Sequence, residues 1–126
     1  MSTILIVEDN EKNMKLVRDI LRHKGYATLE AVNGLDGVRL ALEHKPDLVL
    51  MDIQLPDIDG ITALRRIRED KSLDAVPVLA VSASVMPDEQ QKIVTSGFDA
   101  YITKPIVLKS FLETVQRHLA DGRKRA

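Results

Sequence analysis

Short apolar runs in this chain end on side chains that can do chemistry. Residues 4–7 lead into Glu8 and Asp9, residues 48–51 into Asp52, residues 78–81 into Ser82, and residues 101–103 into Lys104. Runs of this kind are typical of parallel strands buried on both faces of a sheet. The carboxyl ends of such strands meet at one edge, where open α/β sheets place their ligand site. The pattern predicts an α/β domain in which three carboxylates, a hydroxyl and an ammonium group converge.

Segments with helical periodicity separate these runs. We expect a helix from about Asn10, a good N-cap, to Gly25, and further helices at 35–44, around 61–67, at 87–96 and at 108–119, with another strand at 27–32. Strands that alternate with helices indicate five βα units and a parallel sheet. The segment 87–96 is the least apolar helix, so we expect it to be the most mobile one.

Composition favours one domain, which we assign to residues 1–121, followed by a short basic tail at 122–126. The net charge of −1 gives no general attraction to nucleic acid. No apolar stretch approaches the ~20 residues that cross a bilayer, so no membrane partner is expected. The chain has no cysteine and no signal-peptide pattern after Met1, which favours a cytoplasmic location.

The acidic residues at the sheet edge predict a metal site. Alone, Asp52 would more simply be a turn residue, but Glu8 and Asp9 add two more acids at the same edge. Their mutual repulsion would raise carboxyl pKa values unless a cation compensated it. Mg²⁺ is the natural complement, because it is commonly held by one or two carboxylates with waters and phosphate oxygens.

Lys104 and Ser82 predict that the same edge binds a phosphoryl group. A lone lysine is nearly always solvated, Pro105 could simply open the last helix, and Ser82 alone would be uninformative. Together with the acids, they indicate a phosphoryl-binding site. Lys104 could reach one phosphoryl oxygen as a point charge, and Ser82 could donate a hydrogen bond to another.

In this arrangement the chain resembles bacterial response-regulator receiver domains over essentially its whole length. The resemblance rests on these motifs in order and at family spacing: Val7-Glu8-Asp9-Asn10, Met51-Asp52 with Pro56 and Asp59-Gly60 downstream, Val81-Ser82-Ala83, and Tyr101 with Lys104-Pro105. Glu8 stands where many receivers have Asp, and Ser82 replaces the commoner Thr. The motifs look most like those of DivK-type single-domain regulators and the receivers of hybrid histidine kinases.

The resemblance implies a flavodoxin-like, doubly wound (βα)5 fold with a five-stranded parallel sheet in the order 2-1-3-4-5. It also implies the site roles. By this resemblance, Asp52 is the phosphoacceptor, and Ser82 and Lys104 contact the phosphoryl group. Mg²⁺ is bound by Asp9, Asp52 and the Gln54 backbone carbonyl, and by Glu8 through water. Ser82 and Tyr101 form the switch, and the Lys104-Pro105 peptide is cis.

The resemblance further implies a single-domain switch in a two-component phosphorelay. A histidine kinase or a histidine phosphotransfer protein would donate the phosphoryl group by self-catalysed transfer, and hydrolysis would later reset the switch. A downstream protein would bind the face formed by residues 87–96, the strand at 101–103 and the last helix. Whether such a chain counts as an enzyme stays open, because no separate substrate is turned over.

Other readings fit the residues less well. A haloacid dehalogenase phosphatase would need its nucleophile in an Asp-x-Asp pair after the first strand, whereas Asp52 follows a later one. A receiver-fold binding module that works without phosphorylation would be favoured by loss of an acid or of the lysine, yet the set is complete. No glycine-rich loop follows the first run, which disfavours a dinucleotide enzyme. His23, His44 and His118 are expected at solvated helix positions.

Overall fold

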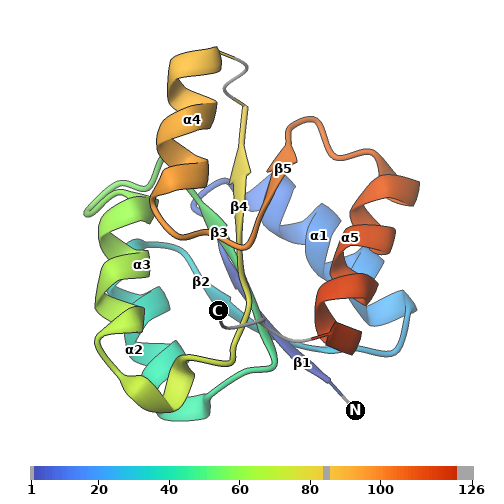
Figure 1. The fold of residues 1–126 in the computed structure, drawn as a ribbon. Helices are drawn as coiled ribbons and strands as arrows, with labels where there is room; N and C mark the ends of the chain where they lie inside the picture. The colour runs from blue at the N-terminus through green and yellow to red at the C-terminus, as the bar shows by residue number, and fades with distance from the viewer. Residues whose placement is uncertain (1, 84–85, 122–126) are drawn as a thin grey trace.

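A computed structural model describes residues 2–83 and 86–121 as a parallel sheet between two layers of helices (Figure 1). The strands are β1 (Thr3–Val7), β2 (Ala27–Ala31), β3 (Leu48–Asp52), β4 (Val78–Ser82) and β5 (Ala100–Thr103). Their order is β2-β1-β3-β4-β5 and every pairing is parallel. The predicted fold class and strand order are therefore confirmed.

The helices divide between the two faces of the sheet. Figure 1 shows α1 (Glu11–His23) and α5 (Leu108–Asp121) on one face, and α2 (Gly34–His44), α3 (Gly60–Arg68) and α4 (Pro87–Thr95) on the other. A 3-10 helix, η1 (Lys71–Leu73), follows α3. The chain thus forms the three layers of a doubly wound α/β domain.

Alternate residues of each strand supply two separate cores. In β1, Leu5 and Val7 pack in the core under α2, α3 and α4, whereas Ile4 and Ile6 pack in the core under α1 and α5. The last four residues of this strand are at most 2% exposed. Burial on both faces explains why the strand sequences are apolar without alternation.

Local signals set most helix boundaries near their predicted positions. The Asn10 side chain accepts a hydrogen bond from the Asn13 backbone at 3.1 Å at the start of α1, and Gly25 has a φ of +89° just beyond its end. Strand β2 ends one residue before the predicted limit, α2 begins one residue earlier, and α4 ends one residue earlier. The prediction did not include η1, whose N-cap is Asp70.

Among the described residues, no helix is long and apolar enough to span a membrane. The proposed basic tail at 122–126 lies outside the described residues, and α5 is described to Asp121.

Candidate functional site

The register of the sheet brings the ends of its central strands to one level. Asp52, the last residue of β3, pairs with Val81 of β4, and Ser82 follows immediately. On the other side of β3, Val7 pairs with Met51, so Glu8 lies next to the level of Asp52. The strand pairing therefore places groups from three strands at the same edge.

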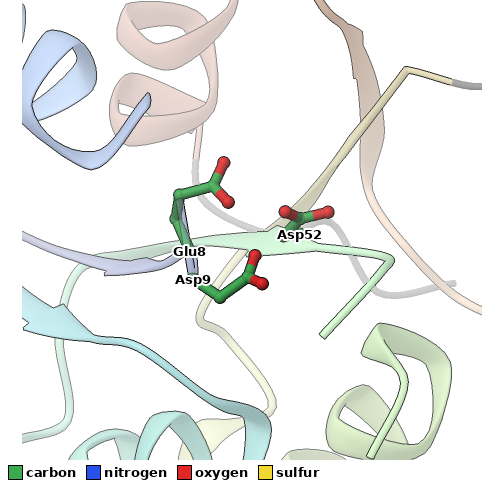
Figure 2. Close-up of side chains that lie close together, drawn as sticks. All are labelled: Glu8, Asp9 and Asp52. Atoms are coloured by element: carbon green, nitrogen blue, oxygen red, sulfur yellow. The ribbon is translucent and has the colours of Figure 1, made fainter. Parts of the chain in front are cut away.

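Three carboxylates converge at this edge. One oxygen each from Glu8, Asp9 and Asp52 lies within 4.8 Å of the others (Figure 2). The first two side chains extend from the end of β1 and the third from the end of β3. Glu8 and Asp52 are each only 5% exposed, whereas Asp9 is exposed to solvent. The group has the hard oxygen donors and the access that a divalent cation requires.

Lys104 lies against the two buried acids. Its Nζ is 2.9 Å from Glu8 Oε1 and 3.0 Å from Asp52 Oδ2. The lysine is placed there by the end of β5, where its backbone N–H donates to the Ser82 carbonyl at 3.0 Å, and its peptide bond with Pro105 is cis. The edge of the sheet thus carries a cation among the carboxylates.

The surroundings shift the pKa values of two of these groups. Burial, followed by a hydrogen bond with Asp52, raises the pKa of Glu8 even though Lys104 acts to lower it. Burial acts to lower the pKa of Lys104, but its bonds to Glu8 and Asp52 outweigh burial and raise it. Lys104 therefore stays charged at neutral pH, and the acids share its positive charge.

The loop from β3 to α3 folds closely around the Asp52 side chain. The Gln54 N–H donates to Asp52 Oδ1 at 3.0 Å, and the Gly60 N–H donates to the Ile53 carbonyl at 2.9 Å. A Cβ on Gly60 would lie 2.5 Å from the Asp52 carbonyl oxygen, so only glycine permits this approach. The loop holds the backbone of Gln54 beside the acids.

Ser82 and Tyr101 lie farther along the same side of the sheet. Ser82 is 4% exposed and, with Gln54, lines a pocket of about 410 Å³ between the β3–α3 loop and α4. Tyr101 is half-buried in β5, opposite Ala80, and packs against the core that also contains Ile93 of α4. Both residues therefore connect the sheet edge with the α4 side of the domain.

The three histidines do not belong to the acidic group. His23 and His44 are exposed at the last positions of α1 and α2. His118 is half-buried in α5, with Nδ1 2.8 Å from the Thr114 carbonyl oxygen. The expected solvated helix positions are thus found for His23 and His44, whereas His118 lies on a helix but is only partly exposed.

Sequence reasoning missed two contacts at this edge. It assigned Glu8 to a water-mediated metal contact but did not anticipate its ion pair with Lys104. It also gave no role to Asp57, whose carboxylate bonds the N-terminus of α2. No local sequence pattern marks either contact, because Glu8 and Lys104 are 96 positions apart and Gly34 and Asp57 are 23 positions apart. For the Glu8–Lys104 pair, the only signal was the presence of both acids and a lysine at the same edge of the sheet.

A doubly wound parallel sheet with an acidic group and a lysine at its carboxyl edge defines a class of α/β domains suited to binding a cation and an anionic ligand together. Comparison with known families narrows the class. The chain belongs to the response regulator receiver domain family, whose sequence profile matches residues 4–116. The predicted family is confirmed.

Curated relatives include the polar-differentiation response regulators DivK of Brucella anthropi and Brucella ovis. The first is 45% identical over 120 residues, covering 95% of this chain and 98% of the relative. The second is 44% identical with the same coverage. The predicted resemblance to DivK-type regulators is therefore confirmed at the level of sequence.

Solved structures agree with the fold and the family. The receiver domain of a Pseudomonas aeruginosa sensor histidine kinase, described with a magnesium ion coordinated in its active site cleft, is 31% identical with a TM-score of 0.88, covering 94% of this chain and 98% of that one. The signal receiver domain of a Syntrophus aciditrophicus signal transduction histidine kinase is 28% identical with a TM-score of 0.89, covering 100% and 96%.

Proposed function

We propose that this chain is a single-domain response regulator that accepts a phosphoryl group on Asp52. The donor is a phosphohistidine of a histidine kinase or of a histidine phosphotransfer protein. The observation that carries the proposal is the position of the Asp52 carboxylate, which lies among two further acids and 3.0 Å from the Lys104 ammonium. The family and the resemblance to DivK support it.

The donor set fits Mg²⁺. Carboxylate oxygens are the ligands that this hard cation prefers, and three of them lie within 4.8 Å of one another. In the proposed arrangement Asp9 and Asp52 are direct ligands, the Gln54 backbone carbonyl is a third, and Glu8 acts through water. When bound, Mg²⁺ supplies positive charge that offsets the phosphoryl oxygens.

The side chains of this site perform the transfer chiefly by alignment and charge. A carboxylate oxygen of Asp52 forms a bond to phosphorus while the phosphorus–nitrogen bond of the donor breaks and its electrons return to the imidazole ring. Lys104, already bonded to Asp52, is positioned to contact a phosphoryl oxygen, and Ser82 donates to another. Hydrolysis of the aspartyl-phosphate then resets the switch.

Phosphorylation is proposed to act on a protein-binding face formed by α4, β5 and α5. Ser82 ends β4 at the level of Thr103 in β5, and Tyr101 lies two residues before that position. Movement of Ser82 toward the phosphoryl group would open space for Tyr101 and shift a pre-existing equilibrium of this face. The downstream partner is a protein that binds the shifted form.

Transfer of labelled phosphate from a panel of phosphorylated donors tests the proposal. Asp52→Asn should abolish acid-labile, base-labile labelling, because an amide cannot act as the nucleophile. Asp70→Asn is the matched control, since Asp70 is a half-buried acid that caps η1 away from the acidic group. Full labelling of the Asp52 variant would contradict the assignment, because another residue would then accept the phosphoryl group. A wild-type protein that no donor labels would instead favour a receiver-fold module that acts without phosphorylation.

A further inference from the structure

We propose that Asp57 is a positioning residue that ties the β3–α3 loop to the N-terminus of α2 and thereby fixes the backbone of Gln54 at the metal site. The inference rests on the proposed function, in which the Gln54 carbonyl is a Mg²⁺ ligand. Asp57 touches neither the metal nor the phosphoryl group in this arrangement. It acts through the loop alone.

Both oxygens of the Asp57 carboxylate bind the start of α2. Oδ1 accepts from the Gly34 N–H at 2.8 Å, and Oδ2 accepts from the Leu35 N–H at 2.9 Å. The helix has its own cap as well, because the Asn33 side chain accepts from the Asp36 N–H at 2.8 Å. The first free N–H groups of α2 are thus shared between a local cap and a distant loop.

Packing beside this contact seats the loop on the helix. A Cβ on Gly34 would lie 2.5 Å from Cγ1 of Ile58 and 3.1 Å from its carbonyl oxygen. Glycine at the first position of α2 therefore lets the residue after Asp57 approach the helix closely. Ile58 is half-buried and packs against the core under α2 and α3.

Charge strengthens the contact. Partial desolvation acts to raise the pKa of Asp57, but hydrogen bonds from the Leu35 and Gly34 backbones outweigh it and lower the pKa. The side chain is therefore a carboxylate at neutral pH, facing the positive end of the α2 dipole. A charged acceptor with two donors holds a fixed position better than a neutral one.

The position of this contact in the loop determines what it controls. Gln54 is tied to Asp52 on one side through its N–H, and Gly60 closes the loop on the other through the Ile53 carbonyl. Asp57 fastens the part of the loop between them to α2. Without the Asp57 carboxylate, the Gln54 carbonyl would sample more orientations. The affinity of the site for Mg²⁺ would then fall although every ligand is still present.

Two variants separate this role from a simple effect on helix stability. Asp57→Ala removes the cap that comes from the loop, whereas Asn33→Ala removes a cap of the same helix and leaves the loop attached. Both should lower the stability of the protein. Only Asp57→Ala should weaken Mg²⁺ binding, by about tenfold, as removal of outer-shell partners of metal ligands does. Should the alanine variant fail to fold, Asp57→Asn replaces it: its amide oxygen can accept only one of the two N–H bonds, so we expect the same pattern with a smaller loss of Mg²⁺ affinity.

Mg²⁺ titration followed by amide NMR gives the affinities, and amide order parameters for residues 54–58 without metal give a second measurement. We expect lower order parameters in the Asp57 variant only. Equal Mg²⁺ affinity in the wild type and in both variants would overturn the inference and leave the proposed function intact. Equal weakening in both variants would also overturn it, because helix stability would then be the cause. A wild-type protein that does not bind Mg²⁺ would overturn both proposals.

Discussion

Lys104 pairs with Asp52 across the carboxyl edge of the sheet, with 3.0 Å between Nζ and Oδ2. The same ammonium lies 2.9 Å from Glu8. Lys104 therefore offsets part of the repulsion expected among these acids, although the pKa of Glu8 remains raised, chiefly by burial. A metal ion bound at this edge would meet carboxylates that this lysine already holds near one another.

Removal of this lysine should destabilise the protein in the absence of metal. Lys104→Met leaves two buried carboxylates without their counter-ion, and the side chains of both are only 6% exposed. Breaking a fully buried ion pair lowers the free energy of unfolding by about 3–5 kcal/mol. Because the Lys104 side chain is 20% exposed and solvent screens its charge, we expect a smaller loss of about 1–3 kcal/mol. Urea unfolding at pH 7 measures the free energy of unfolding.

Magnesium provides the diagnostic comparison for this variant. Because Mg²⁺ can supply the missing positive charge, it should raise the unfolding free energy of Lys104→Met more than that of the wild type. Lys15→Met is the control, since Lys15 pairs with Asp19 on the exposed surface of α1 and should matter little. An equal response to MgCl₂ in all three proteins would show that Lys104 does not compensate the acidic group.

Gly60→Ala should distort the backbone at Asp52. The new Cβ would lie 2.5 Å from the Asp52 carbonyl oxygen and 2.9 Å from the Ile53 Cα, and neither backbone atom can move as a side chain can. We expect a loss of about 1–3 kcal/mol in unfolding free energy. Amide shifts of Asp52 and Gln54 should change as well.

Gly25→Ala is the matched control for this prediction. Gly25 has a φ of +89°, but a Cβ there would meet nothing within 4 Å. Its cost should be limited to backbone strain, of about 1 kcal/mol, with no shift at Asp52. A Gly60 variant as mild as the Gly25 variant would mean that the loop adjusts easily around Asp52.

Local sequence signals account for the strands and most helix limits. The run at 48–51 is apolar at every position because both faces of β3 are covered, and Asn10 is a cap that binds a backbone N–H three residues on. The same uniform burial hides which side chains face which helices. The apolar run at 48–51 does not indicate that Leu50 packs under α1 and α5 while Met51 packs under α2 and α3.

Long-range contacts explain why the site was predicted only in part. The strand ends identified Asp52, Ser82 and Lys104 as neighbours, since a parallel sheet gathers them at one edge. The pairing of Lys104 with Glu8, and the binding of Asp57 to the start of α2, depend on loop geometry between elements far apart in the chain. Such geometry leaves no periodic trace in the sequence.

Ser82→Ala should uncouple phosphorylation from the α4–β5–α5 face. The serine is almost fully buried, and its hydroxyl is the proposed link between the phosphoryl group and Tyr101. Asp52 should still accept phosphate, although more slowly. Amide shifts with and without beryllofluoride, a phosphoryl mimic, measure the response. A wild-type-sized response throughout α4 and around Tyr101 would show that the hydroxyl is not the relay.

The Asp57 carboxylate should make an acid-sensitive contribution to stability. Its pKa is lowered in the folded protein from an ordinary value of 3.8, so folding favours the charged form. Stability from a lowered carboxyl pKa is fully present above the unfolded value and is lost as the pH falls through the folded one. The stability difference between wild type and Asp57→Asn should therefore stay constant above about pH 5 and shrink steadily toward pH 2.

The effect of Asn33→Ala on stability should change less with pH, because the amide cap has no charge to lose. Urea unfolding at several pH values gives both differences, and a difference for Asp57→Asn that stays constant down to pH 2 would show that its charge does not stabilise the fold.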